Sequence, residues 1–441
     1  MNKQELLRKI TDRKAAVAIV GMGYVGLPLA LRFADEGFTV RCIDINVAKV
    51  EVLNTGRSYI KHISHERVAG AVRGQLFRAT TDYSVIGGVD AVILCVPTPL
   101  GSHQEPDLSY MTGTLDSVIP RMRPGQLLSL ESTTYPGTTD EEIISRLAGR
   151  GLKPGETVFV VFSPEREDPG NANFTTATIP KVVGGHTQTC LEVGIALYAA
   201  VVERVVPVSS TRVAEMTKLL ENIYRSVNIG LANELKMVCD RMGIDIWEVI
   251  EAAATKPFGF APFYPGPGLG GHCVPIDPFY LTWKAKEYGV HARFIELAGE
   301  VNTSMPHYVV QRVVEALNSG SKSLNGSRIL LLGLAYKANV DDMRESPTFV
   351  LMDLLKRRGA AVAYYDPFIP TITPSRKHAH WTGTRSVTWS VDSLRQFDLA
   401  IIATNHDSVD YQALLDAVPC IVDTRNALSR FSPRDGQVWK A

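Results

Sequence analysis

A thiol stands in a glycine-rich segment of the chain. Cys273 ends the stretch GPGLGGHC, and an acid, Asp277, follows four residues later. Four glycines and a proline in eight residues exclude the interior of a regular helix or strand. The thiol therefore belongs to a shaped loop, where it is a candidate nucleophile. The alternative is a small buried cysteine with no chemical role.

A second candidate for chemistry is the glycine triplet of GMGYVG, at Gly21, Gly23 and Gly26. A β-branched stretch precedes it, and a helical apolar pattern follows it. This is the context in which such a triplet binds a dinucleotide. Gly21 permits the tight turn, Gly23 lets the backbone approach a pyrophosphate, and Gly26 allows close packing of helix on strand. A glycine-rich turn without a ligand is the alternative.

The next predicted strand, FTVRCID, ends in Asp44. An acid about 20 residues after the glycines accepts hydrogen bonds from the ribose hydroxyls, which favours NAD over NADP. Tyr24 and Val25 stand within the same turn and are expected beside the cofactor.

Three later strands carry polar residues at their ends. Thr98 follows the first, Thr133 the second and Glu165 the third. The carboxyl ends of the strands of an open α/β sheet form its ligand-binding edge, so we expect these three residues on one rim. Thr98 either touches the cofactor or only caps its loop.

A long amphipathic helix is predicted from Thr211 to Arg241. Its apolar residues recur every three or four positions and are expected to form one stripe, made of Val213, Met216, Leu219, Ile223, Val227, Leu231, Leu235 and Val238. Lys218 and Asn222 are four residues apart and share another face, with Glu215 and Arg225 near it. The alternative is an ordinary solvated charged face.

The last third of the chain repeats the strand, turn, helix and strand pattern after a polar linker at residues 318–327. The repeat ends at Asp366, as the first ends at Asp44, but Lys337 and Arg344 replace the glycine triplet. Cations in such a turn indicate a bound diphosphate. A dimerisation or lid domain with solvated charges is the alternative.

The composition excludes several classes of protein. The chain has 46 basic and 46 acidic residues, so nothing points to nucleic acid or to an acidic membrane surface. No apolar run is long enough for a membrane span, and the first residues lack the apolar core of a signal peptide, so a cytoplasmic location is expected. Six cysteines without a CxxC pair, and ten histidines without ligand spacing, predict neither a disulfide framework nor a metal site.

These patterns predict an α/β protein with two Rossmann-like doubly wound domains, joined by a long central helix and a helical core. The expected boundaries are an NAD-binding domain at 1–209, a central helical domain with the cysteine loop at 210–317, and a C-terminal domain at 318–441.

At this point the chain resembles the UDP-glucose/GDP-mannose dehydrogenase family over nearly its whole length. The matching motifs stand in order, namely GMGYVG, VPTP, STTYPGT, SPERE, EMTKLLEN, GGHCVPIDP and KANVDDMRESP. The resemblance implies a homodimer or larger homo-oligomer formed through the helical core, and a part in making precursors of surface polysaccharides.

The resemblance also implies roles for single residues. The catalytic group would be Cys273, Lys218, Asn222, Asp277, Glu165 and Thr133. Glu165, Lys218 and Asn222 would also contact the UDP-sugar, together with Arg166, Tyr264, Gly268, Gly270, His272 and Lys337. Thr98, Thr133 and Arg344 would join the glycine turn around NAD, with Arg344 and Lys337 closing the domains on the substrate.

The implied reaction is a four-electron oxidation of a sugar alcohol at C6 to the acid, through a thiohemiacetal and a thioester on Cys273. GGHCVPIDP has His272 and Val274 where many UDP-glucose members have serine and an aromatic residue. With SPEREDPGN, it resembles the branch that oxidises UDP-N-acetylhexosamines, and UDP-GlcNAc is the expected substrate. UDP-glucose, UDP-ManNAc and UDP-GalNAc stay open, as do a two-electron hydroxyacid-type dehydrogenase and a non-catalytic NAD-binding scaffold.

Overall fold

The computed structural model describes residues 2–61, 63–101, 104–167, 174–271, 274–375 and 377–441. The chain forms two compact units. The first comprises Met1–Glu221 and Phe279–Val290, and the second comprises Asn222–Pro278 and His291–Ala441. Both contain a sheet of mainly parallel strands between helices, which confirms the predicted α/β fold with two Rossmann-like domains. The division into three domains stays a prediction.

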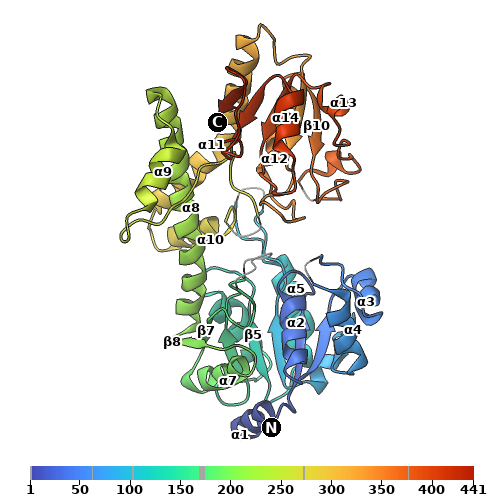
Figure 1. The fold of residues 1–441 in the computed structure, drawn as a ribbon. Coiled ribbons are helices and arrows are strands. Elements are labelled where there is room, and N and C mark those ends of the chain that lie inside the picture. The colour runs from blue at the N-terminus through green and yellow to red at the C-terminus, as the bar shows by residue number, and fades with distance from the viewer. Residues whose placement is uncertain (1, 62, 102–103, 168–173, 272–273, 376) are drawn as a thin grey trace. The chain divides into compact units, whose positions relative to one another are not determined.

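The first unit is built on a sheet of eight strands among the described residues, in the order β3-β2-β1-β4-β5-β6-β7-β8. In Figure 1 this sheet lies in the blue-to-green part of the ribbon. Neighbouring strands are parallel except β6 and β7, which are antiparallel. The strands are β1 (Ala16–Val20), β2 (Thr39–Ile43), β3 (Phe77–Thr80), β4 (Ala91–Leu94), β5 (Leu127–Leu130), β6 (Phe159–Phe162), β7 (Lys181–Gly185) and β8 (Val205–Val208).

Both faces of this sheet are covered, as the apolar strand sequences require. In β1, Val17 and Ile19 point into one core layer, and Ala18 and Val20 point into the other. The first layer is closed by α1 (Lys3–Thr11), α2 (Gly26–Asp35), α3 (Val47–Asn54), α4 (His65–Arg73) and α7 (Gln188–Ala199). The second is closed by η1 (Tyr83–Gly88), α5 (Ser109–Val118), η2 (Ile119–Arg121), the π-helical η3 (Thr139–Ile144) and α6 (Ser145–Ala148).

The predicted long helix is α8 (Thr211–Met242), and its residues are divided between the two units after Glu221. Three further helices follow it, namely α9 (Ile246–Ala254), α10 (Asp277–Glu287) and α11 (Arg293–Ser319). Residues 256–276 hold no helix or strand among those described, which fits the predicted loop. None of the described helices is long and apolar enough to cross a membrane.

The second unit is built on a parallel sheet in the order β10-β9-β11-β12-β13. The strands are β9 (Arg328–Leu332), β10 (Ala361–Tyr365), β11 (Leu399–Ile402), β12 (Ile421–Asp423) and β13 (Val438–Lys440). One face packs on α11 and α12 (Pro347–Arg357), and the other on α13 (Val391–Leu394) and α14 (Tyr411–Ala417). A short η4 (Ala379–Trp381) completes the unit.

Each sheet has one position where the strand order reverses. In the first it lies between β1 and β4, and in the second between β9 and β11. Ligands of doubly wound sheets bind outside the carboxyl ends of the strands at such a position. The first lies beside the turn with the glycine triplet, and the second beside the turn that carries Lys337 and Arg344.

Candidate functional site

The three glycines after β1 are needed for different physical reasons. Gly21 has a φ of +96°, and a β-carbon there would lie 2.5 Å from the carbonyl oxygen of Cys95. A β-carbon on Gly26 would lie 1.9 Å from the carbonyl oxygen of Gly21. A β-carbon on Gly23 would meet no protein atom within 4 Å. Protein packing therefore requires Gly21 and Gly26, while the space beside Gly23 is open to a ligand.

That space lies at the start of α2. Val25, the residue before the helix, has no side-chain hydrogen bond to the first turn. The first amides of α2 can therefore bind an anion, and a pyrophosphate fits this position. These residues fit NAD, with Tyr24 and Val25 half-buried in the same turn.

Asp44 supports the glycine turn from the end of β2. One carboxylate oxygen accepts the Met22 amide at 2.9 Å, and the other accepts the Asn46 amide at 2.9 Å. The Lys49 ammonium lies 3.6 Å from the carboxylate. Asp44 therefore links the ends of β1 and β2 at the place where a ribose is expected.

The loops after β4 and β5 are tied together by Thr98. Its hydroxyl donates to the carbonyl of Thr133 at 2.7 Å, and its own carbonyl accepts from the Tyr280 hydroxyl at 2.8 Å. This contact links the two loops, and contact of Thr98 with the cofactor stays a prediction. Because β4, β5 and β6 are neighbours in the sheet, Thr98, Thr133 and Glu165 all follow strands at the same edge.

Glu165 and Lys218 are in direct contact. The Lys218 ammonium, on a residue only 8% exposed, donates to the main-chain carbonyl of Glu165 at 2.5 Å. The Glu165 carboxylate accepts the amides of Arg166, at 2.6 Å, and Glu167. Arg166 itself pairs with Glu221 at 2.6 Å. The structure therefore brings these two predicted site residues together in the first unit.

The predicted apolar stripe of α8 is not uniformly buried. Leu219 and Ile223 are buried, but Val213, Leu231, Leu235 and Val238 are between 43% and 54% exposed. At about 100° per residue the eight predicted positions spread over roughly 160°, which is wider than one packing face. Exposed apolar residues form a narrower stripe, namely Val213, Leu220, Tyr224, Leu231, Leu235, Val238 and Met242.

The opposite side of α8 is polar and buried. It consists of Glu215, Lys218, Asn222, Ser226, Asn233 and Lys236, each at most 8% exposed. This is the reverse of an ordinary surface helix, whose apolar residues face inwards. The solvated charged face considered for Lys218 is therefore not what the structure shows.

Glu215 is a buried residue to which the sequence assigned no role. Its carboxylate accepts the amide of Gly137 at 2.6 Å, the amide of Thr139 at 2.9 Å and the hydroxyl of Thr139 at 2.7 Å. These contacts fix the segment that follows Thr133. Burial raises the pKa of Glu215 to about 7, against the hydrogen bonds from Thr139 and Gly137 that lower it. The sequence signal that could have identified Glu215 was its place in EMTKLLEN, one turn before Lys218.

In the second unit Asn222 contacts Asp277. The Asn222 amide donates to the Asp277 carboxylate at 2.5 Å, and the two residues are 3% and 2% exposed. Arg225 donates to the side-chain oxygen of Asn222 at 3.3 Å. His272 and Cys273 lie outside the described residues.

The glycines before the cysteine contact protein atoms. A β-carbon on Gly270 would lie 2.6 Å from Tyr336, and one on Gly268 would lie 3.1 Å from Pro347. Gly271 donates its amide to the Arg344 carbonyl at 3.0 Å. The loop therefore needs glycine in order to pack against residues 336–347, while backbone contact of Gly268 and Gly270 with a sugar stays a prediction.

Tyr264 lies earlier in the same loop and is 38% exposed. Its ring stacks on Trp247 with the centroids 5.4 Å apart, and its hydroxyl donates to Glu251 at 3.1 Å. The exposed ring offers an aromatic face, and its contact with a substrate stays a prediction.

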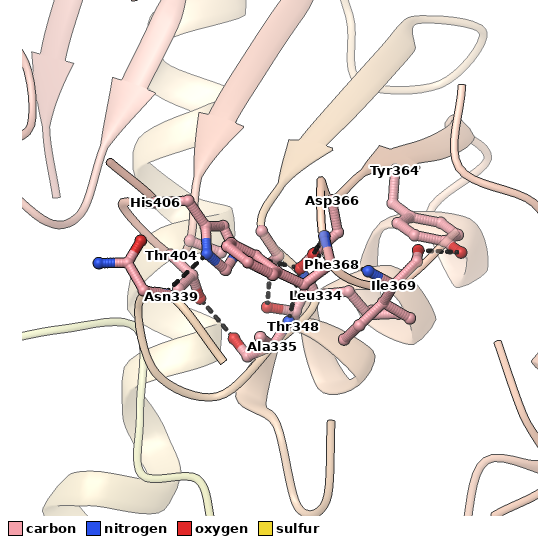
Figure 2. Close-up of polar contacts among 12 residues, drawn as sticks. Leu334, Ala335, Asn339, Thr348, Tyr364, Asp366, Phe368, Ile369, Thr404 and His406 are labelled. Atoms are coloured by element: carbon pink, nitrogen blue, oxygen red, sulfur yellow. Dashed lines mark hydrogen bonds and ion pairs between the residues drawn. The ribbon is translucent and has the colours of Figure 1, made fainter. Parts of the chain in front are cut away.

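The turn after β9 carries the predicted cations. The Arg344 guanidinium binds Asp342 through both carboxylate oxygens, with Nη2 to Oδ2 at 2.6 Å. Lys337 is half-buried in the same turn. Two side-chain hydrogen bonds hold the main chain of this turn. Thr404 donates to the Ala335 carbonyl at 2.6 Å, and Thr348 donates to the Gly333 carbonyl at 3.0 Å (Figure 2).

Arg425 is a cation that the sequence reading missed. It follows β12 in the stretch DTRN, and its guanidinium donates to the Ala403 carbonyl at 2.9 Å. A β-carbon on Gly266 would lie 2.5 Å from this guanidinium. Burial lowers the pKa of Arg425 to about 10, against the opposing effect of Asp423. The sequence signal that could have identified Arg425 was its position after a strand at the ligand-binding edge.

Three segments of the chain match known domains. Residues 15–202 match the NAD-binding domain of the UDP-glucose/GDP-mannose dehydrogenase family. Residues 212–304 match its central domain, and residues 330–430 match its UDP-binding domain.

Individual relatives differ in substrate. The chain is 35% identical over 355 residues to a UDP-N-acetyl-D-glucosamine 6-dehydrogenase of Pseudomonas aeruginosa, covering 80% of this chain and 83% of that protein. It is 33% identical to an NDP-N-acetyl-D-galactosaminuronic acid dehydrogenase of Ralstonia nicotianae, covering 94% and 96%. A solved UDP-D-ManNAc dehydrogenase from Pyrococcus horikoshii superposes with a TM-score of 0.86 at 30% identity, covering 96% and 98%.

Proposed function

Because the chain belongs to the UDP-glucose/GDP-mannose dehydrogenase family, and is thus an NAD-dependent nucleotide-sugar dehydrogenase, we propose that it oxidises a UDP-N-acetylhexosamine at C6. The alcohol and one water become the uronic acid, while two NAD become two NADH with release of two protons. UDP-GlcNAc is the proposed substrate. The observation that carries the proposal is the buried polar side of α8, which supplies Lys218 and Asn222.

Lys218 and Asn222 provide positioned donors. Lys218 is held by the Glu165 carbonyl, and Asn222 is held by Asp277. Donors fixed in a water-poor site stabilise an oxygen that gains negative charge, first the C6 alkoxide and then the tetrahedral oxyanion. NAD, when bound, accepts the hydride. Its preference over NADP follows from Asp44, which would repel a 2′-phosphate.

Cys273 serves the second oxidation. The C–H hydrogen of an aldehyde does not leave as hydride until a nucleophile has added and made C6 tetrahedral, and the Cys273 thiolate adds to form a thiohemiacetal. Its oxidation gives a thioester on Cys273. Thr133 and Asp277 order a water, and Glu165 takes a proton from it as the water attacks the thioester. The acid and the free thiol are the products.

Support for the UDP part comes from the second unit. Lys337, Arg344 and Arg425 are cations near the position where the strand order reverses, and the segment matches a UDP-binding domain. Support for an N-acetylhexosamine comes from the relatives, which are named as dehydrogenases of the N-acetylglucosamine, N-acetylgalactosaminuronic acid and N-acetylmannosamine types. The choice of UDP-GlcNAc rests on GGHCVPIDP and on the Pseudomonas relative.

The experiment measures products and NADH per sugar for a panel of UDP-sugars and GDP-mannose. We expect two NADH per UDP-GlcNAc, and we expect Cys273→Ala to abolish formation of the acid while NAD and sugar still bind. A ratio of one NADH per sugar would indicate a two-electron dehydrogenase. Normal acid formation by Cys273→Ala would contradict the mechanism, and faster turnover of UDP-glucose or GDP-mannose would contradict the substrate class.

A further inference from the structure

A buried lysine contacts two carboxylates in the first unit. The Lys181 ammonium lies 2.6 Å from Glu131 and 3.5 Å from Glu165. The Tyr198 hydroxyl donates to the other oxygen of Glu131 at 2.6 Å, and Ser129 lies 2.7 Å from that hydroxyl.

The sheet topology explains how the lysine reaches this place. β6 and β7 are antiparallel, so the first residue of β7 lies at the carboxyl edge of β6. The register pairs Phe162 with Gly184, and its extension by three positions sets Lys181 opposite Glu165. Glu131 follows β5, the other neighbour of β6. A reversal of one strand thus puts a cation between two acids at the ligand-binding edge.

Burial makes this arrangement unusual. As whole residues, Glu131 is 1% exposed and Lys181 is 5% exposed. Burial raises the pKa of Glu131, and the Lys181 ammonium opposes that rise. A buried ion pair adds little stability compared with apolar residues of similar volume, so stability alone does not account for this pair.

Glu165 is the member of the group with access to the surface. Its side chain is 13% exposed, compared with 0% for Glu131 and 7% for Lys181. One carboxylate oxygen is fixed by two main-chain amides, and the other faces Lys181. The shorter contact of Lys181 is with Glu131, which leaves the ammonium only partly directed at Glu165.

We propose that Lys181 and Glu131 are positioning residues that orient the Glu165 carboxylate and set how readily it takes up a proton. The positive charge of Lys181 favours the ionised carboxylate of Glu165, which weakens it as a base. The negative charge of Glu131 opposes this effect of Lys181. The proposal rests on the proposed role of Glu165 in hydrolysis of the thioester.

Other titratable groups also lie around Glu165. They are Cys95 after β4, Glu167 in the same loop, Tyr198 on α7 and Lys218 on α8. Burial raises the pKa of Cys95 and of Tyr198, and burial with the nearby Glu165 charge raises the pKa of Glu167 to about 8. Lys181 is the neighbour whose ammonium lies between two carboxylates, at 2.6 Å from Glu131 and 3.5 Å from Glu165.

The test is the pH dependence of kcat for acid formation. Glu131→Gln keeps the shape of the side chain and an acceptor for Tyr198 but removes the negative charge. The acidic limb of the plot of kcat against pH should therefore move to lower pH by about one unit. Lys181→Met removes the cation, so the limb should move up. Lys181→Arg keeps the charge and should restore a limb close to that of the wild type. KM for NAD should stay within about two-fold in all three.

Glu165→Gln separates the two proposals. Retention of the acidic limb in Glu165→Gln would contradict the role of Glu165 itself. Loss of the limb there, with no opposite movement in Glu131→Gln and Lys181→Met, would overturn the positioning role alone. If Lys181→Met does not fold, the other two variants test the positioning role. The acidic limb should then move to lower pH in Glu131→Gln and stay in place in Lys181→Arg.

Discussion

His406 Nε2 lies 3.1 Å from the Asp366 carboxylate, and both side chains are fully buried. The other ring nitrogen of His406 accepts the amide of Asn339 at 3.0 Å, so the ring proton belongs on Nε2. Asp366 also accepts the amides of Leu334 and Ala335, at 2.7 and 2.9 Å (Figure 2). Burial raises the pKa of Asp366, but these donors, His406 first, bring it below its usual value.

His406 and Asp366 together hold the turn that carries Lys337 and Arg344. We expect His406→Phe to raise KM for the UDP-sugar about ten-fold with little change in kcat, because the Asn339 amide loses its acceptor on the His406 ring and the turn loosens. Steady-state kinetics with UDP-GlcNAc measure this. His380→Ala is the control, since that side chain is 52% exposed and contacts Asp353 elsewhere. Equal effects of both changes on KM would refute the argument.

Glu215 should make stability depend on pH. Its pKa of about 7 in the folded protein lies above the usual value of 4.5. Its contribution to the free energy of unfolding is therefore fully present below pH 4.5 and is lost as the pH rises through 7. The free energy of unfolding of the wild type, relative to Glu215→Gln, should therefore fall by roughly 2–3 kcal/mol between pH 4.5 and pH 8. Urea titrations at several pH values test this. Glu203→Gln, at an exposed position, is the matched control.

Alanine substitutions at Gly23 and Gly26, in the same turn, should have different effects. Gly23→Ala meets no protein atom and should leave Tm unchanged, but its methyl occupies the space expected for pyrophosphate, so Kd for NAD should rise at least about ten-fold. Gly26→Ala forces an atom to 1.9 Å from Gly21 and should lower stability by about 1–3 kcal/mol. Thermal unfolding without NAD and titration with NAD separate the two effects. Unchanged NAD affinity in Gly23→Ala would contradict a ligand at this position.

Much of the fold was accessible from the sequence because its signals are local. The glycine turn, the alternating strands and helices, and the repeat ending at Asp366 all depend on neighbouring residues. The pairing of Glu165 with Lys218 was not accessible, because it depends on how α8 rotates against the sheet. The ion pair of Lys181 and Glu131 required knowledge that β7 runs antiparallel to β6.

The glycines at 268 and 270 show a second limit. A glycine in a sequence indicates that no side chain fits, but the sequence does not say what fills the space. In the structure the neighbours of these glycines are Tyr336 and Pro347. The orientation of α8 stayed open in the sequence for a similar reason, since an apolar stripe is equally compatible with a core and with a partner.

The exposed apolar stripe of α8 leads to the prediction of a homodimer. Tyr224, Leu231 and Met242 are each more than half exposed on the side opposite the buried polar residues. A contiguous apolar surface of this kind is stabilised by burial against another subunit, and a second copy of the same helix offers a matching surface. Leu231→Asp would bury a charge there and should give a monomer in sedimentation velocity at micromolar concentration. Val391→Asp, at a residue of comparable exposure on α13, should leave the dimer intact. A wild-type protein that is monomeric and fully active would contradict this prediction.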